Sequence, residues 1–189
     1  MRLVLMLANL APHKGQETVI RAMAILKKAK IDIACWFVGV QRHGAGDYTT
    51  RLQDLCNELG VADRIRFLGH REDVPDLLRA ADIFFLPSTS EGLPLSVLEA
   101  QATKVPVLAA PTAGIPEVIT DGETGFLIPA EDAVGYAKRI VSLLNCPEIQ
   151  HRVKEQAYTN VIKEHNWYTY CETVWRLYHS VMRREYSES

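Results

Sequence analysis

Short apolar runs alternate with longer amphipathic segments along the first 130 residues of the chain. The clearest run, Ile83-Phe84-Phe85-Leu86, is apolar at every position, which is typical of a parallel strand that is covered on both faces. The alternation predicts a Rossmann-like three-layer α/β/α domain with a mostly parallel sheet of about six strands, ending in C-terminal helices. Further strands are predicted at 1–7, 31–40, 65–69, 105–109 and 126–129, and helices at 17–30, 48–59, 73–80, 94–102, 115–118, 132–145, 147–163 and 167–184.

Composition excludes several classes of protein. At 189 residues, 48% of them hydrophobic and 23% charged, the chain can bury about 70% of its unfolded surface in one core. Its net charge of −2 gives no basic field for nucleic acid, and no apolar run reaches the roughly 20 residues of a membrane span. The four cysteines are scattered without a C-x-x-C pair, which favours reduced thiols over a zinc site. We therefore expect a cytoplasmic protein, for which peripheral contact with the inner face of a membrane stays open.

The segment from Ser88 to Ala100 links the most apolar strand to the following helix and is the leading candidate for a binding site. Pro94 suits the first turn of that helix, and the free N–H groups of the preceding loop lie at the positive end of a helix dipole, where an anion can bind. Glu91 is expected in this loop and Glu99 about one turn into the helix, both facing the loop mouth. The residues of this helix that are predicted to face the core share helical spacing: Leu95, Leu98 and Ala102.

A carboxylate pair beside an anion site fits a ligand that carries both phosphate and several hydroxyls, as a nucleotide sugar does. Carboxylates accept paired hydrogen bonds from vicinal diols, while backbone N–H groups hold a diphosphate. Lys14 follows the first predicted strand and precedes a helix, so it lies at the sheet edge where open α/β folds bind ligands. The alternative is that Glu91 is a solvated loop residue and Glu99 a helix-surface residue.

Several motifs occur in a fixed order along the chain: Lys14-Gly15, Phe67-Leu68-Gly69, the segment from Pro87 to Ala100, Gly114-Ile115-Pro116-Glu117-Val118 and Asp121-Gly122-Glu123-Thr124-Gly125-Phe126. Together they resemble the C-terminal, donor-binding domain of a GT-B fold retaining glycosyltransferase, of glycosyl transferases group 1 or family 4. The resemblance runs from Leu3 to about Val181, and its most specific part is the Glu-x7-Glu pattern of Glu91 and Glu99. It implies half of a GT-B fold and transfer of a hexose with retention. A UDP-sugar is the expected donor, with GDP- and ADP-sugars as alternatives.

By position, the resemblance assigns roles to the residues that match the family's motifs. Lys14 would neutralise the donor diphosphate and Glu91 would bind a sugar hydroxyl, and these two are the expected catalytic residues. Glu99 would bind the ribose diol. Stabilisation of the leaving diphosphate would be this domain's share of catalysis, and the resemblance implies no metal and no cofactor besides the donor substrate. The other residues expected at the donor are Asn9, Gly15, Gly39, Gly69, His70, Arg71, Gly92, Leu93, Pro94 and Leu95.

The chain departs from the family at three positions. Asn9 stands where the family usually has an arginine as a second diphosphate contact, and the loss could cost about 1.5–3 kcal/mol unless Arg42 or Arg66 compensates. Lys104 replaces a glycine between a helix and a strand and is expected to mark a different turn. Ala113 replaces the first glycine of a frequent pair and is expected to narrow the sugar pocket.

The resemblance also implies an N-terminal acceptor domain, which we expect to be absent from this chain. Residues 1–189 are then a single nucleotide-sugar-binding domain with 147–189 as a helical extension. On its own such a domain is expected to bind the donor and to be inactive in transfer, because both reactants must be positioned together. The acceptor would be a saccharide or a lipid-linked saccharide, as in polysaccharide biosynthesis of the bacterial type.

Three alternatives come from other functional classes. A nucleotide-sugar epimerase could share the architecture, although Lys14 with the two glutamates favours a transferase. A dinucleotide oxidoreductase is disfavoured because no Gly-x-Gly-x-x-Gly follows any predicted strand. A non-catalytic nucleotide-binding or subunit-interaction module stays open. It predicts a dimer and an exposed apolar face that involves Trp175, Leu177 and Tyr178 of the last helix.

Overall fold

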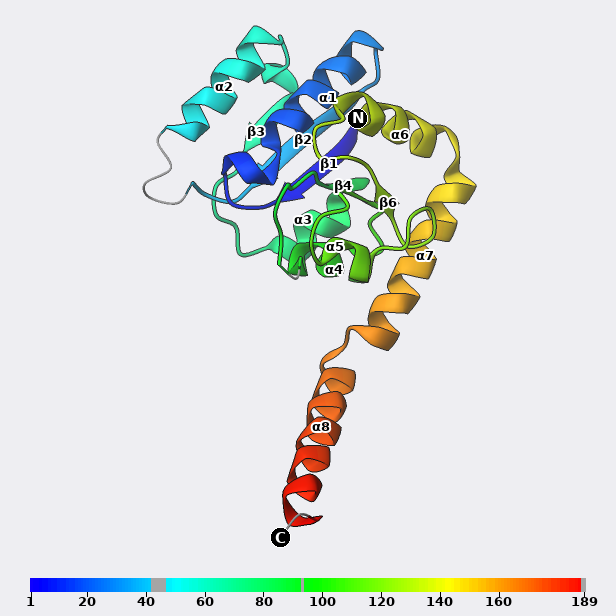
Figure 1. The fold of residues 1–189 in the computed structure, drawn as a ribbon. Coiled ribbons are helices and arrows are strands. Elements are labelled where there is room, and N and C mark those ends of the chain that lie inside the picture. Colours follow the sequence, from blue (N-terminus) through cyan, green and yellow to red (C-terminus); the bar gives the residue numbers. More distant parts are fainter. Residues whose placement is uncertain (42–46, 93, 188–189) are drawn as a thin grey trace.

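The computed structural model describes residues 1–41, 47–92 and 94–187 and has three layers, α/β/α (Figure 1). One six-stranded sheet runs in the order β3-β2-β1-β4-β5-β6. Every neighbouring pair of these strands is parallel, which confirms the predicted fold class. The bounds are β1 Arg2–Leu7, β2 Ile33–Val38, β3 Ile65–Phe67, β4 Ile83–Leu86, β5 Val107–Ala109 and β6 Phe126–Leu127.

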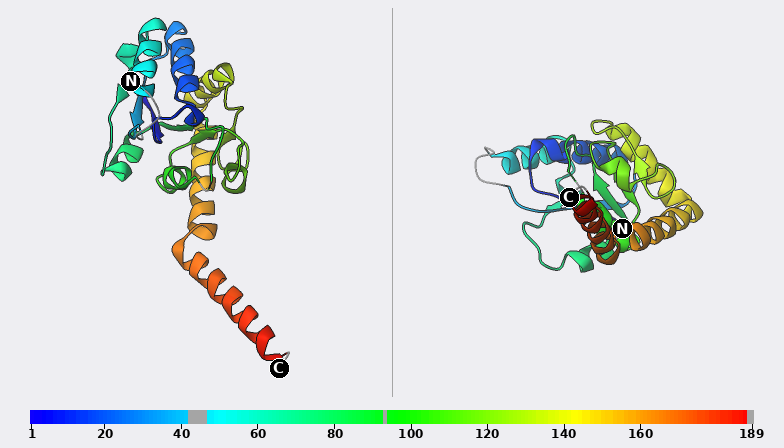
Figure 2. Two further views of the ribbon diagram at one scale, coloured as in Figure 1. Left: turned by 60° about the vertical axis from the view of Figure 1, so that its left-hand side comes forward. Right: turned by 60° about the horizontal axis from the view of Figure 1, so that its bottom comes forward.

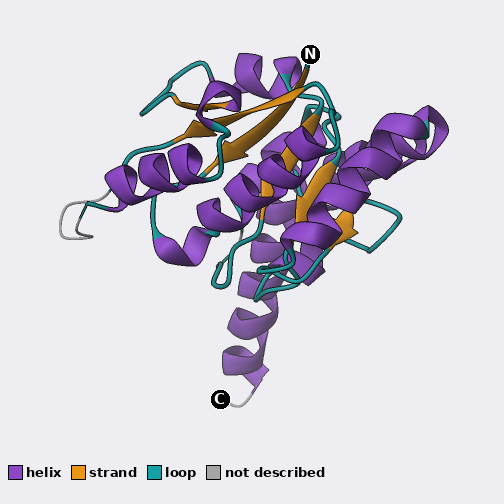
Figure 3. Cartoon of the chain, turned by 90° about the horizontal axis from the view of Figure 1, so that it is seen from above, coloured by secondary structure: helices purple, strands orange, loops and turns teal. Residues whose placement is uncertain are grey.

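Helices cover both faces of the sheet, whose strands run through the middle of the domain (Figures 1 and 3). In one layer, α1 (Gln16–Lys28) packs against both α2 (Tyr48–Glu58) and α6 (Ala133–Asn145). In the other layer, α4 (Leu95–Ala102) packs against α3 (Val74–Ala80) and α7 (Pro147–Glu164). Three single turns complete this part of the chain: η1 (Pro12–Lys14), η2 (Ala62–Arg64) and α5 (Ile115–Val118).

The centre of the sheet is the apolar core and also positions the candidate site. All four residues of β4 are buried, as its continuous apolar run predicts. Val4, Leu5 and Met6 of the neighbouring β1 are buried as well. Because β1 and β4 pair in parallel, the loops that follow them leave the same edge of the sheet side by side.

The buried face of α4 differs from the predicted one. Its core-facing residues are Val97, Ala100 and Gln101, whereas Leu95 is 63% exposed. Leu98 is half-buried, and Ala102 is exposed. Pro94 stands at the N-cap, one position before the predicted first turn. The prediction of Leu95, Leu98 and Ala102 as the buried stripe was therefore wrong.

The buried Gln101 explains why the core-facing side of α4 was predicted wrongly. The side-chain amide nitrogen of Gln101 donates to the backbone carbonyls of Val118 and Thr124, at 3.1 and 3.0 Å. A buried amide is tolerated in an apolar layer when it is hydrogen-bonded in this way. The buried face of α4 contains a glutamine, whereas the predicted face contains two leucines. Hydrophobic spacing alone therefore favours the wrong face.

The two C-terminal helices behave differently from each other. α7 packs on α4, whereas α8 (Trp167–Ser187) leads away from the body of the domain (Figures 1 and 2). Every side chain from Tyr170 to Met182 is exposed. The predicted exposure of Trp175, Leu177 and Tyr178 is confirmed, at 66%, 65% and 68%. Among the described residues, no helix combines the length and apolarity needed to span a bilayer.

Candidate functional site

Backbone hydrogen bonds join the loops at the carboxyl edge of the sheet. After β2 and β3, the N–H of Gly39 donates to the carbonyl of Gly69 at 2.8 Å. After β1 and β4, the N–H of Thr89 donates to the carbonyl of His13 at 2.8 Å. Four strands thus contribute to one continuous rim, as expected for a ligand site in an open α/β sheet.

Two glycines let these loops approach each other closely. Gly15 has φ +79°, and a Cβ built on it would lie 2.2 Å from the carbonyl oxygen of Pro87. Gly39 has φ +141°, and its Cβ would lie 2.1 Å from the carbonyl oxygen of Ala8. Only glycine combines this backbone conformation with such contacts. The structure therefore shows a packing role for Gly15 and Gly39, and their contact with a donor stays a prediction.

Lys14 and Glu91 form an ion pair across the rim. The Lys14 Nζ lies 2.8 Å from Oε1 and 2.9 Å from Oε2 of Glu91, so both carboxylate oxygens accept from the same ammonium group. The two side chains are only 18% and 10% exposed. Sequence reasoning placed both residues in one crevice, and the structure adds that they neutralise each other.

The start of α4 lies in the same loop as Glu91. Pro94 caps the helix without a side-chain hydrogen bond, so the first N–H groups of α4 lack a capping side chain within the described residues. Gly92, just before it, is exposed, and a Cβ there would meet nothing within 4 Å. Leu93 lies outside the described residues. An anion could approach this helix end from the open side of the loop.

Glu99 lies farther along α4, on its exposed side. Partial burial raises the pKa of its carboxyl group above the ordinary value of 4.5. The hydrogen bonds described for the Lys14 ammonium go to Glu91 and not to Glu99. The two glutamates of the predicted pair therefore differ in their surroundings, since Glu91 is ion-paired and Glu99 is open to solvent.

Comparison with known proteins identifies the family. The family model described as glycosyl transferases group 1 matches residues 1–160. The chain belongs to this family. Among curated relatives, a putative glycosyltransferase EpsD of Bacillus subtilis is 34% identical over 149 residues, which are 79% of this chain and 38% of EpsD. The N-acetyl-alpha-D-glucosaminyl L-malate synthase of Bacillus anthracis is 30% identical over 182 residues, which are 96% of this chain and 46% of the synthase.

Solved structures of GT-B glycosyltransferases share the fold of this group 1 family member. Anabaena Alr3699/HepE in complex with UDP aligns with a TM-score of 0.89 and 26% identity, over 94% of this chain and 48% of that one. The C-terminal domain of LpcC, a group 1 glycosyl transferase from Francisella tularensis, aligns with a TM-score of 0.80 and 24% identity, over 88% and 87% of the two chains. The present chain thus spans less than half the length of the curated relatives named above.

Asn9, where the family usually has arginine, lies in the loop between β1 and η1. Its backbone carbonyl accepts a hydrogen bond from the side-chain nitrogen of the fully buried Gln16, at 2.9 Å. Of the two arginines proposed as substitutes, Arg42 lies outside the described residues. Arg66 is exposed on β3, and the hydrogen bonds and ion pairs described in the rim do not involve it.

His70 and Arg71 follow β3, where a contact with the base was predicted. Arg71 is bound by Asp73 through two hydrogen bonds of 2.8 and 2.5 Å. The hydrogen bond to Arg71 lowers the pKa of Asp73 and raises that of Arg71. The positive charge of Arg71 is therefore compensated locally, while His70 is exposed.

Two departures from the family occupy the left-handed region of the backbone. Lys104 has φ +58°, the conformation in which glycine is favoured, and the expectation of a turn different from the family's stays a prediction. Its ammonium pairs with Glu155 at 2.7 Å and lies 4.6 Å from the ring centre of Tyr158, which ties the turn to α7. Ala113 has φ +45° in the loop after β5, and the narrowing of a sugar pocket by its methyl group stays a prediction.

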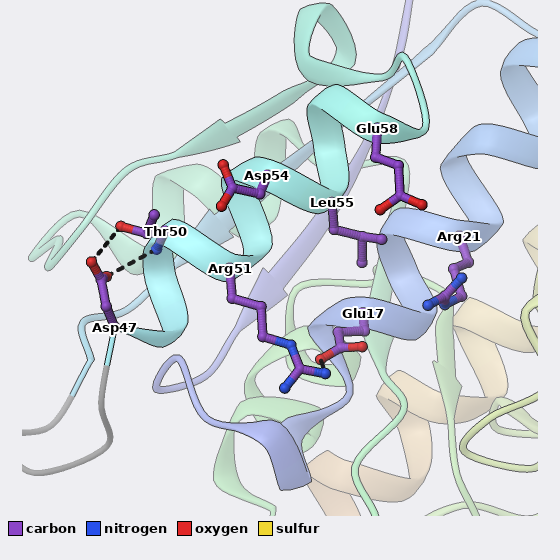
Figure 4. A pocket seen from close by; sticks show the side chains of 8 residues that line it. All are labelled: Glu17, Arg21, Asp47, Thr50, Arg51, Asp54, Leu55 and Glu58. Carbon is purple, nitrogen blue, oxygen red and sulfur yellow. Dashed lines mark hydrogen bonds and ion pairs between the residues drawn. The ribbon is translucent and has the colours of Figure 1, made fainter.

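Two clefts of the described residues are lined by α1, and the lining of neither includes Lys14 or Glu91. One of ≈ 390 Å³ is lined by the start of α1 together with Pro87, Thr89 and Glu131. Another of ≈ 460 Å³ lies between α1 and α2 (Figure 4), where Arg51 pairs with Glu17 at 2.9 Å. The residues described contain no cluster of three or more His, Cys, Asp or Glu placed to hold a metal ion. The candidate site is the rim itself, because the open edge of one domain need not form a closed cavity.

Proposed function

We propose that this chain is the donor-binding part of a glycosyltransferase that transfers a hexose, with retention, from a nucleotide sugar to a saccharide or lipid-linked acceptor. The observation that carries the proposal is the shielded Lys14–Glu91 pair beside the uncapped start of α4. The family membership and the similarity to Anabaena Alr3699/HepE, solved in complex with UDP, support it, and they favour a UDP-sugar over GDP- and ADP-sugars.

Each group has a chemical task in this proposal. Lys14 and the α4 N-terminus stabilise the negative charge that develops on the departing diphosphate. Glu91 accepts a hydrogen bond from a sugar hydroxyl, and the more exposed Glu99 accepts hydrogen bonds from the ribose diol. The whole enzyme would include an acceptor domain, in line with the span of 38–46% of the curated relatives. A cytoplasmic location follows if the thiols remain reduced, since all four cysteines are free.

Calorimetric titration with UDP, GDP and ADP tests the proposal. We expect saturable binding of one nucleotide, weakened about tenfold or more by Lys14→Ala and by Glu99→Ala, because each removes a hydrogen bond to a charged group. Lys27→Ala is the matched control, since Lys27 is also ion-paired, to Asp63 at 2.6 Å, but lies outside the rim. Absence of UDP, GDP and ADP binding by the wild type and also by Glu91→Gln, in which Lys14 no longer faces a competing charge, would refute the donor-site assignment.

The exposed α8 favours a second candidate function, a subunit-interaction module. Its large apolar side chains, with Trp175 and Tyr178 among them, are open to solvent over most of the helix. Patches of this kind mark association surfaces. Sedimentation equilibrium would show a concentration-dependent dimer under this alternative, and a monomer that binds nucleotide would exclude it.

A further inference from the structure

Lys14 and Glu91 contact each other directly, and the geometry of their ion pair limits what either group can do. The Lys14 Nζ lies within hydrogen-bond distance of both oxygens of Glu91, at 2.8 and 2.9 Å. A carboxylate offers about four lone-pair sites, but the Glu91 side chain is only 10% exposed. Lys14 therefore fills the accessible part of Glu91, and the negative charge of Glu91 cancels the positive charge that a diphosphate would seek.

A diphosphate that binds at the α4 N-terminus must compete with Glu91 for the Lys14 ammonium. Once the ammonium turns to the phosphates, the shielded Glu91 carboxylate loses both of its hydrogen bonds. A charge left unpaired at a shielded position is strongly unfavourable. Hydroxyl groups of a sugar attached to the same diphosphate could replace the two lost hydrogen bonds.

We infer that this ion pair makes the site selective for a complete nucleotide sugar over the free nucleoside diphosphate, a conclusion that rests on the proposed function. A complete donor supplies a partner for Lys14 and another for Glu91. The nucleoside diphosphate left after transfer supplies only the first, so re-formation of the ion pair favours its release. A free sugar lacks the phosphates that would draw Lys14 away from Glu91.

The test is a calorimetric comparison of UDP, GDP and ADP binding to the wild-type chain and to Glu91→Gln. The substitution keeps the size of the side chain and removes the charge that competes for Lys14. We expect the nucleoside diphosphate to bind about tenfold tighter to Glu91→Gln, because hydrogen bonds to charged groups are worth that much or more. Glu155→Gln is the matched control, because Glu155 also forms an ion pair with a lysine, Lys104, but belongs to α7 and not to the rim. The nucleotide affinity of Glu155→Gln should equal that of the wild type.

A double-mutant cycle shows whether the gain passes through Lys14. In a Lys14→Met background, Glu91→Gln should tighten nucleotide binding less than in the wild type, because it removes only the repulsion between the carboxylate and the diphosphate and releases no ammonium. A thermal melt of each variant shows that it is folded. UDP-glucose, titrated alongside UDP, should lose its advantage over UDP in Glu91→Gln if glucose is an accepted sugar.

The outcomes distinguish failure of the ion-pair inference from failure of the proposed function. Equal or weaker nucleotide binding by Glu91→Gln, with clear binding by the wild type, overturns the inference and leaves the donor site in place. A gain in the Lys14→Met background as large as that in the wild type overturns it as well. Lack of nucleotide binding by both the wild type and Glu91→Gln refutes the proposed function itself, together with the inference that rests on it. Binding by Glu91→Gln alone supports both.

Discussion

Gly15→Ala is the sharpest test of how the rim is assembled. Two costs add at this position. An alanine at φ +79° costs about 1 kcal/mol relative to glycine. The new Cβ would also lie 2.2 Å from the Pro87 carbonyl oxygen. Moving the backbone to relieve this contact costs about 1–3 kcal/mol more of folding free energy. We expect a total loss of about 3 kcal/mol in the free energy of unfolding.

Gly60→Ala separates the two costs. Gly60 has φ +65°, but a Cβ there would meet nothing within 4 Å, so only the conformational cost of about 1 kcal/mol remains. In urea unfolding, the free energy falls by about 2 kcal/mol per M of urea. Gly15→Ala should therefore lower the urea midpoint by about 1.5 M and Gly60→Ala by about 0.5 M. Equal shifts for the two variants would show that the η1 loop does not rest on the loop after β4, and the close approach of Lys14 and Glu91 would lose its explanation.

Two other predictions concern α4. Gln101→Met should lower the free energy of unfolding by about 2 kcal/mol in urea titrations, because two buried backbone carbonyls lose their donor; an unchanged midpoint would contradict this role. Burial raises the pKa of Glu99, so the folded chain keeps the carboxyl proton to a higher pH than the unfolded chain does. The free energy of unfolding should therefore fall as the pH rises from 4.5 through the folded pKa of Glu99. Glu99→Gln should remove this decline from urea midpoints measured between pH 4 and 7, and an identical decline in the variant would refute the assignment.

Most of the fold could be predicted because the local patterns are strong. The apolar run of β4 and the amphipathic period of α1 lead to a parallel sheet with little ambiguity. The face of α4 could not be predicted, because the hydrogen bonds of the Gln101 side-chain nitrogen go to the carbonyls of Val118 and Thr124, which only the tertiary structure brings near. Local spacing contains no information about such partners.

The proximity of Lys14 and Glu91 could be predicted from the sequence, but their electrostatics could not. Lys14 and Glu91 were placed in one crevice because each follows a strand of the same sheet. The bidentate ion pair between them, and the Asp73 partner that compensates Arg71, depend on side-chain conformations that sequence spacing does not specify. The left-handed conformation of Lys104 was missed for a related reason, since its compensating contacts come from α7.

The pairing of β1 with β4 has a consequence for how the chain folds. Lys14 and Glu91 are separated by 77 positions along the chain, and they can meet only after these two central strands have joined. Contacts of such long range form slowly, because the chain entropy of closing the intervening loop is lost before the contact forms. A nascent chain that ends before β4 contains Lys14 but not Glu91, so it cannot form the ion pair of the rim. A ligand that needs both halves would bind only the completed sheet and would stabilise it by mass action.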